Sequence, residues 1–407
     1  MAAIKKHSPL LYILLFILAH FFHHLMTALV VPLLPFIRNG FGLSYAQSGL
    51  VVSAFTLAYG IGQLPAGWLA DRIGPRYVLT VGVAGVALAG AAVGISMRWE
   101  TLIIFLICMG IAGGGYHPAA APLISAAVPP AQRGRALGLH LIGGSASHLA
   151  APLAGVLIAG WLGWRASFLI LSLPVLLFGA ALFAILTHHE IRARAGHAAR
   201  SDASINEEAE TPARPALIAV FLIMTASVGA FTGSSIAFLP LYLVDIFGVS
   251  EQGAAVFLSA FYATGIWASP LGGAASDRFG PLTVFLILAL AVGPLIVLLA
   301  VAGSWVVAAL VMLGVGITLF VRMPVSETYL VSSVRKRNRS TVLGIYFFAG
   351  MEASGVITPV LGWLIDVYGF RRGYASVGIL LTLIIVCGCV VLLGLSRQDR
   401  ARLRLQS

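Results

Sequence analysis

Charged residues are scarce in this sequence: they make up 10% of its 407 residues, whereas hydrophobic residues make up 59%. A water-soluble domain carries roughly 25% charged residues, so the composition excludes that class of protein. Cysteine is scarce as well. Cys108, Cys387 and Cys389 are odd in number and lie in apolar runs, which excludes a disulfide framework and a CxxC metal pair.

Apolar segments long enough to cross a bilayer are abundant instead. A transmembrane helix needs about 20 consecutive apolar residues. Twelve segments meet this requirement, and most are separated only by tight turns. The predicted spans are residues 10–37, 44–70, 76–97, 101–127, 134–160, 164–187, 215–243, 250–273, 281–302, 304–333, 339–366 and 371–395. The fold class is therefore an all-α integral membrane protein.

The net charge of +11 raises the question of a nucleic-acid partner. If the N-terminus is cytoplasmic, most of the 25 Lys and Arg residues fall on cytoplasmic segments, which is the positive-inside pattern of membrane proteins. We therefore predict a protein of the cytoplasmic (inner) membrane with both termini in the cytoplasm. The basic charge is explained by topology, so no nucleic-acid partner is predicted, and we expect a monomer in the lipid bilayer.

The longest polar stretch is residues 188–214, which is rich in Ala, Glu, Ser and Arg and has no apolar periodicity. Such a composition is typical of a flexible linker, although a regulatory or docking segment is an alternative. The linker divides the spans six and six. The predicted domains are an N-terminal bundle, 1–187, and a C-terminal bundle, 215–407.

An internal repeat supports this division. The segment GWLADRIGP, residues 67–75, returns as GAASDRFGP, residues 273–281, at an offset of 206, the difference between 277 and 71. Five pairs share this offset: Asp71 and Asp277, Pro118 and Pro324, Arg133 and Arg339, Gly138 and Gly344, Arg165 and Arg371. Two pseudo-symmetric six-helix bundles are what alternating access requires, because one bundle can rock against the other.

The loop after the second span and the division into six and six spans resemble the major facilitator superfamily over nearly the whole chain. The resemblance implies a transporter, without enzyme activity and without a cofactor. It also implies that the loop is a conformational latch, whose alternative is a plain positive-inside turn. The latch residues are Gly67, Asp71, Arg72, Gly74 and Arg76, with Asp277 and Arg278 in the second copy.

A narrower resemblance is to fosmidomycin-resistance-like and other proton-coupled drug exporters. It is carried by the segments LLPFIRNGFGLSYAQSGL and GGGYHPAAAPLISAAVPPAQRGRALG. Such exporters commonly have an Asp in the first span, where this chain has His23 and His24, and related antiporters often have an Arg in the fourth span, which is missing here. The resemblance implies export.

Ionisable groups inside the spans are the candidate functional residues. A charge near the bilayer centre costs about 2.5–3.5 kcal/mol on insertion scales, so such residues are kept for a reason. The candidates are His20, His23, His24, His117, His140, His148, Arg322, Glu327 and Glu352. In the superfamily fold, spans 1, 4, 7 and 10 line the central cavity and spans 2, 5, 8 and 11 lie beside it, so the resemblance places all nine near that cavity.

Arg322 is the expected anchor for a carboxylate, phosphate or phosphonate, since guanidinium groups bind such anions with two parallel hydrogen bonds. Its alternative role is an internal ion pair with Glu352 or Glu327. Glu352 is the expected proton carrier, with a purely structural role beside Arg322 as its alternative. Glu327 is the second proton-coupling candidate, in a cytoplasmic gate.

His20 and His24 lie one helical turn apart on the same face, with His23 at the edge of that face. Since histidine titrates near neutral pH, the face can relay protons or contact substrate; packing and transition-metal binding are the alternatives, and no metal site is predicted. Tyr116 and His117 follow three glycines in the fourth span, and Tyr116 is the repeat equivalent of Arg322. We therefore predict Tyr116 and His117 as further substrate-binding residues.

These features predict a secondary active transporter that exports a small organic anion or zwitterion in exchange for protons. No phosphate-binding P-loop is present to support an ATP-driven pump. Uptake of an organic anion by proton symport is one alternative. A transporter-like receptor or scaffold is another, although the chain has no large polar appendage.

Overall fold

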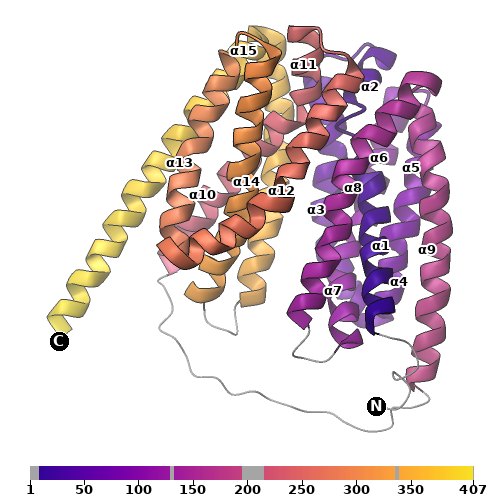
Figure 1. Ribbon diagram of the computed structural model, residues 1–407, viewed down its shortest axis with the longest axis horizontal. Coiled ribbons are helices and arrows are strands. Elements are labelled where there is room, and N and C mark those ends of the chain that lie inside the picture. The colour runs from indigo at the N-terminus through magenta and orange to yellow at the C-terminus, as the bar shows by residue number, and fades with distance from the viewer. Residues whose placement is uncertain (1–8, 129–132, 195–214, 335–338, 407) are drawn as a thin grey trace. The chain divides into compact units, whose positions relative to one another are not determined.

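The computed structural model describes residues 9–128, 133–194, 215–334 and 339–406 (Figure 1). Throughout these ranges the regular structure is helical, with no strand. Most of the predicted linker, and the side chain of Glu352, lie outside the described residues. The chain divides into two compact units.

Unit 1 contains the described residues of Met1–Gly42, Val51–Asn206 and Glu251–Ser259. Short turns connect its helices, and glycine or proline stands at most of these turns. Its helices are α1 (Pro9–Thr27), α2 (Leu34–Phe41), most of α3 (Tyr45–Ile73), α4 (Pro75–Thr80), the π-helical turn η2 (Val81–Gly85), α5 (Val86–Gly94), α6 (Trp99–Gly114), α7 (Tyr116–Ala127), α8 (Arg133–Leu162) and α9 (Trp164–Arg194).

Unit 2 contains the described residues of Leu43–Leu50, Glu207–Ser250 and Ala260–Ser407. Its helices are α10 (Pro215–Ala237), α11 (Leu239–Phe247), most of α12 (Glu251–Phe279), α13 (Pro281–Ala300), α14 (Trp305–Ser333) and α15 (Arg339–Gln406). Helix α15 is two helices in sequence, because Gly369 has non-helical backbone angles. The first turns of α3 belong to unit 2, although the rest of α3 is in unit 1. The first turns of α12 belong to unit 1, although the rest of α12 is in unit 2. The predicted domain boundaries at residues 187 and 215 stay a prediction.

The number of long apolar helices agrees with the predicted spans. Among the described residues, ten helices are long and apolar enough to cross a membrane, and a shorter apolar helix covers Tyr12–Thr27. The last of the ten, Phe348–Leu392, contains Gly369 and therefore includes two spans. The protein is a multi-pass α-helical membrane protein with twelve spans, as the sequence predicts.

Six glycines with positive φ show the repeat in the backbone itself. Positive φ is a conformation that residues with a Cβ rarely adopt, so glycine marks the position of each such turn. The six residues form three pairs at the offset of 206: Gly42 (φ 65°) with Gly248 (65°), Gly74 (101°) with Gly280 (81°), and Gly163 (83°) with Gly369 (78°). The two halves therefore make the same turns at equivalent positions.

Replacing one of these glycines tests the turn directly. We expect Gly280→Ala to destabilise the protein by about 1–2 kcal/mol, because the alanine Cβ disfavours positive φ. No atom lies within 4 Å of the position that this Cβ would take, so crowding does not contribute. The measurement is the thermal unfolding midpoint of the purified protein in detergent.

Gly273→Ala is the matched control for this substitution. Gly273 lies seven residues earlier in α12, also has open space around its Cβ position, and has helical φ. Alanine there should be neutral or stabilising by about 0.5 kcal/mol. Equal midpoints for the two variants would contradict the assigned role of Gly280.

Unit 2 also contains a carboxylate cap on the first turn of α3. The backbone N–H groups of Tyr45 and Ala46 donate to the two carboxylate oxygens of Asp366, at 2.8 Å each. The Tyr45 hydroxyl donates to Asp245 at 2.7 Å. Acidic groups stabilise a helix N-terminus because they accept hydrogen bonds from N–H groups that have no partner within the helix. The three contacts hold this turn of α3 against α11 and α15.

Candidate functional site

Six histidines gather inside unit 1, on three helices. Helix α1 supplies three of them at positions i, i+3 and i+4, which lie on one side of a helix. Helix α7 begins directly after the break at Gly115, so its first turn presents a tyrosine and a histidine side by side. The histidines are His20, His23 and His24 on α1, His117 on α7, and His140 and His148 on α8.

Glycines on α8 bring the helices close enough for these rings to meet. A Cβ on Gly144 would lie 2.6 Å from the His20 ring, and a Cβ on Gly143 would overlap the carbonyl oxygen of Ile17. Small residues allow such close backbone approach between membrane helices. The His20 ring therefore lies directly against the backbone of α8.

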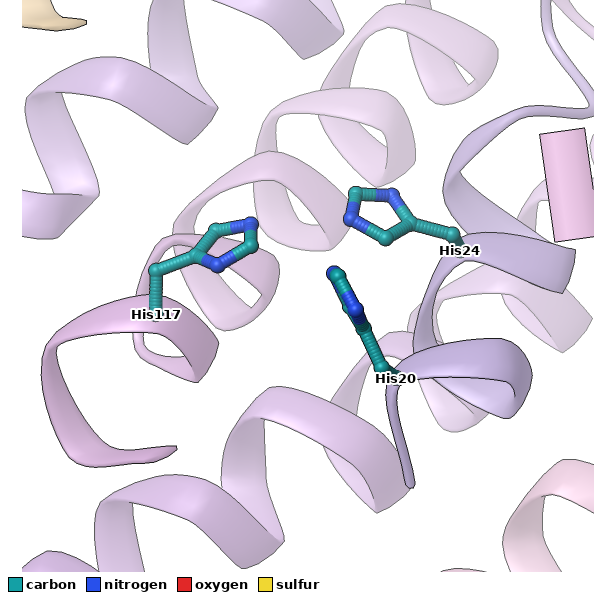
Figure 2. Close-up of side chains that lie close together, drawn as sticks. All are labelled: His20, His24 and His117. Carbon is teal, nitrogen blue, oxygen red and sulfur yellow. The ribbon is translucent and has the colours of Figure 1, made fainter. Parts of the chain in front are cut away.

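Three of the rings face one another, as Figure 2 shows for His20, His24 and His117. The ring centroids of His20 and His24 are 4.7 Å apart. The ring centroid of His117 lies 5.4 Å from that of His20 and 5.5 Å from that of His24. One ligand nitrogen from each of the three lies within 4.8 Å of the others. His148 is next to them, with its centroid 4.8 Å from that of His24.

His20 contacts the backbone of α8 through one ring nitrogen. Its Nδ1 lies 2.9 Å from the carbonyl oxygen of His140, and the backbone N–H of Gly144 donates toward the same Nδ1 at 3.2 Å. A carbonyl can only accept and an amide N–H can only donate, so the two contacts belong to opposite tautomers of the ring. Nε2 is buried and, among the described residues, has no hydrogen-bond partner.

His23 has both ring nitrogens engaged. Its Nδ1 donates to the carbonyl oxygen of Gly82 at 2.7 Å, and the Tyr59 hydroxyl donates to its Nε2 at 3.1 Å. One donor and one acceptor are the complement of a neutral imidazole. Tyr59 was not a sequence candidate; a hydroxyl-bearing ring within an apolar span is the signal that could have found it.

Tyr116 lies between two of these rings. It is fully buried and stacks on His20 and on His23, at centroid distances of 5.4 Å and 4.4 Å. Its hydroxyl makes a 3.0 Å hydrogen bond with Nε2 of His140. The structure therefore brings together, in unit 1, the predicted substrate residues Tyr116, His117, His20 and His24.

Arg322 is a buried cation in unit 2. It lies on α14, and its side chain is 3% exposed. Among the described residues, its Nε and Nη1 have no hydrogen-bond partner, and Arg322 makes no ion pair with Glu327. The side chain of Tyr346 on α15 is a neighbour of the guanidinium. An ion pair with Glu352 stays a prediction, because that side chain lies outside the described residues.

The predicted latch residues lie at the ends of α3 and α12. Asp71 and Arg72 are exposed, as are their repeat equivalents Asp277 and Arg278. The Arg72 guanidinium lies 4.0 Å from the centre of the Trp68 ring. Three further members are placed as follows: Gly67 is on α3, Gly74 precedes α4 with positive φ, and Arg76 donates to the Tyr77 hydroxyl at 2.6 Å.

Comparison with known proteins identifies relatives that match most of the chain. The Major Facilitator Superfamily matches residues 16–357. Multidrug resistance protein MdtG of Salmonella paratyphi C is 29% identical over 360 residues, which are 84% of this chain and 86% of that protein. The probable sulfoacetate transporter SauU of Cupriavidus necator is 29% identical over 257 residues, or 60% of this chain and 59% of that protein.

Solved structures show the same fold. A bacterial homologue of the human lysosomal transporter Spinster, in an inward-facing and occupied conformation, aligns with a TM-score of 0.76 at 18% sequence identity. The alignment covers 96% of this chain and 98% of that structure. At this identity the similarity concerns the fold alone.

Proposed function

Because this chain belongs to the major facilitator superfamily and is a membrane transporter rather than an enzyme, we propose that it exports a small organic anion or zwitterion in exchange for protons. Alternating access provides the mechanism, as expected for two repeated six-helix halves. The exposed segments around Asp71 and Asp277, at the ends of α3 and α12, act as latches that favour one conformation. The positive-inside pattern supports a cytoplasmic-membrane location with both termini in the cytoplasm.

The observation that carries this proposal is the buried guanidinium of Arg322. A cation inside a membrane domain is costly, by about 2.5–3.5 kcal/mol on insertion scales, and the cost is higher when its donors lack partners. Among the described residues, two of its three nitrogens have no hydrogen-bond partner. An anionic ligand with two oxygens would fill these positions with charge-assisted hydrogen bonds. These open donor positions support a role of Arg322 in substrate binding.

Two relatives support the substrate class and the direction. Sulfoacetate, named in one of them, is a small anion with a carboxylate and a sulfonate group. The name of the other contains multidrug resistance, which favours outward transport. A guanidinium can grip either oxyanion of a molecule such as sulfoacetate. Small organic sulfonates and carboxylates are thus the first ligands to examine.

Reconstituted vesicles provide the test. Purified protein in proteoliposomes is given a transmembrane pH gradient, and movement of labelled sulfoacetate and other small dianions is followed in both directions. Accumulation on the acidic side that collapses with a protonophore would support proton-driven antiport. Transport that ignores the gradient would contradict proton coupling, and accumulation on the alkaline side would indicate symport.

Glu352→Gln separates coupling from binding. We expect this variant to lose gradient-driven accumulation but to retain exchange of labelled for unlabelled substrate, because glutamine cannot carry a proton yet preserves the shape of the side chain. Glu327→Gln should have a smaller effect, since Glu327 is the second candidate. Exposed Glu100, paired with Arg98 at 3.4 Å, offers Glu100→Gln as the matched control with full transport. Wild-type accumulation by Glu352→Gln would rule Glu352 out as the proton carrier.

A further inference from the structure

The imidazoles of unit 1 have a geometry that the anion-export proposal leaves unexplained. His20, His24 and His117 come from two helices, and one nitrogen of each lies within 4.8 Å of the other two. In Figure 2 the three rings point toward a common centre. Neutral histidines that only fill space do not need to direct their nitrogens at one point.

His20 is already arranged as a metal ligand. A metal-bound histidine characteristically donates its second ring N–H to a backbone carbonyl or carboxylate, which fixes the tautomer and the ring orientation. In the tautomer with the proton on Nδ1, this N–H donates to the carbonyl oxygen of His140 at 2.9 Å, and stacking on the His140 ring at 4.1 Å holds the ring plane. Nε2, which carries the lone pair in that tautomer, is buried and has no hydrogen-bond partner among the described residues.

The other two ligands complete the set. Nδ1 of His24 is 3.0 Å from the Thr27 hydroxyl, a contact that orients the ring as the His140 carbonyl does for His20. His117 begins α7 directly after the Gly115 break, and its ring is partly buried. Two of the three imidazoles, those of His20 and His24, thus have an outer hydrogen bond, and three imidazoles are a ligand set found in zinc proteins.

We propose that His20, His24 and His117 bind a divalent transition-metal ion of the Zn²⁺, Co²⁺ or Ni²⁺ type. Three nitrogens bonded to one Zn²⁺ at about 2.1 Å in tetrahedral geometry lie about 3.4 Å apart. The longest separation between two of the present ligand nitrogens, up to 4.8 Å, must therefore shorten by roughly 1 Å or more. Rotation of the side chains provides this movement. Mg²⁺ and Ca²⁺ do not suit this site, since these ions prefer oxygen ligands.

The charge of the site favours an anion as a further ligand of the metal. Helices α1, α7 and α8 contain no Asp or Glu, so a bound dication keeps its full charge inside the membrane domain. Such a charge needs compensation. Three imidazoles leave at least one coordination position open in a tetrahedral site, and an anionic donor fits there. His148, next to His24, is the protein's own candidate for a fourth ligand.

This inference goes beyond the proposed function, because its ligand is a metal ion and its residues lie in unit 1, whereas the proposed anion contact is Arg322 in unit 2. Metal binding is measured without transport. Failure of one proposal therefore leaves the other intact.

Cobalt provides the direct test, because tetrahedral Co²⁺ with nitrogen ligands has an intense visible absorption that octahedral aqueous Co²⁺ lacks. The full-length protein is purified in detergent, freed of any affinity tag, and titrated with CoCl₂. We expect one equivalent to give the tetrahedral spectrum and one equivalent of ZnCl₂ to bleach it. A folded wild-type protein that gives neither signal would overturn the proposal, and no variant is needed for this result.

Variants then assign the ligands. His117→Gln and His24→Gln should each weaken Co²⁺ binding by about 100-fold or more, since a lost ligand costs at least as much as a lost outer partner. Exposed His188 on α9 provides the control His188→Gln, which should bind as wild type. Folding of each variant is checked by gel filtration and thermal midpoint. Unchanged affinity in folded His117→Gln and His24→Gln would overturn the assignment and place the ion at the surface.

Discussion

Arg322→Met is expected to abolish binding and transport of the organic anion without lowering the stability of the protein. Methionine keeps much of the side-chain volume and removes the charge. The loss should be at least about 100-fold, because a hydrogen-bonded charge pair in a buried site is worth roughly 3–5 kcal/mol when one partner is removed. Binding is measured as the ligand-induced rise of the thermal midpoint, and transport in proteoliposomes.

The stability of this variant distinguishes the two roles considered for Arg322. If the guanidinium is kept for substrate, the empty protein carries an unpaired buried cation, and its removal should raise the midpoint or leave it unchanged. If Arg322 instead neutralises Glu352, removal leaves a carboxylate without a partner, and the midpoint should fall. A stable variant that still binds anions would refute the proposed site.

Two further variants serve as comparisons for Arg322→Met. Arg322→Lys keeps the charge but loses the two-pronged donor geometry, so it should bind weakly rather than not at all. Arg98→Ala removes an exposed cation, 78% accessible, whose ion-pair partner Glu100 is also exposed. Full activity is expected there, since exposed ion pairs contribute little.

Gly143→Ala is expected to be among the most destabilising single substitutions in unit 1, at about 3 kcal/mol or more. The added methyl would overlap the carbonyl oxygen of Ile17, which belongs to the backbone of α1 and cannot rotate away. Helices α1 and α8 would have to separate, and the His20 ring, which rests on the next glycine, would lose its support. The measurements are the thermal midpoint and the yield of monodisperse protein.

Gly138→Ala is the control for this prediction. Gly138 lies on the same helix, five residues earlier, and no atom lies within 4 Å of its Cβ position. Alanine in an open helical position should stabilise by about 0.5–1 kcal/mol. A wild-type midpoint for Gly143→Ala would mean that α1 and α8 are further apart than described.

The spans were predictable because each depends on a local property. A run of about 20 apolar residues has few alternatives to a membrane helix, and the turns at Gly74 and Gly280 could be located from the repeated loop sequence. The gathering of His20, His24, Tyr116 and His117 was also accessible, since the cost of burying polar groups marked them individually.

The specific partners were not predictable, because they depend on residues far apart in the chain. Nothing near Asp366 indicates that it accepts from Tyr45 and Ala46, which lie 321 and 320 residues away. The same holds for Tyr59, whose hydroxyl holds His23, 36 residues before it. The two backbone groups beside Nδ1 of His20, on His140 and Gly144, likewise lie 120 and 124 residues away.

The three pairs of left-handed glycines carry a consequence for ancestry. Turns that recur at one fixed interval indicate a gene of half this length that was duplicated and fused. Both copies have kept the same bends, whereas many of the side chains between them now differ. At one equivalent position the first copy has Tyr116 among imidazoles, and the second has the buried Arg322. Duplication thus gave one scaffold two independent chemistries, soft nitrogen donors in one copy and a fixed positive charge in the other.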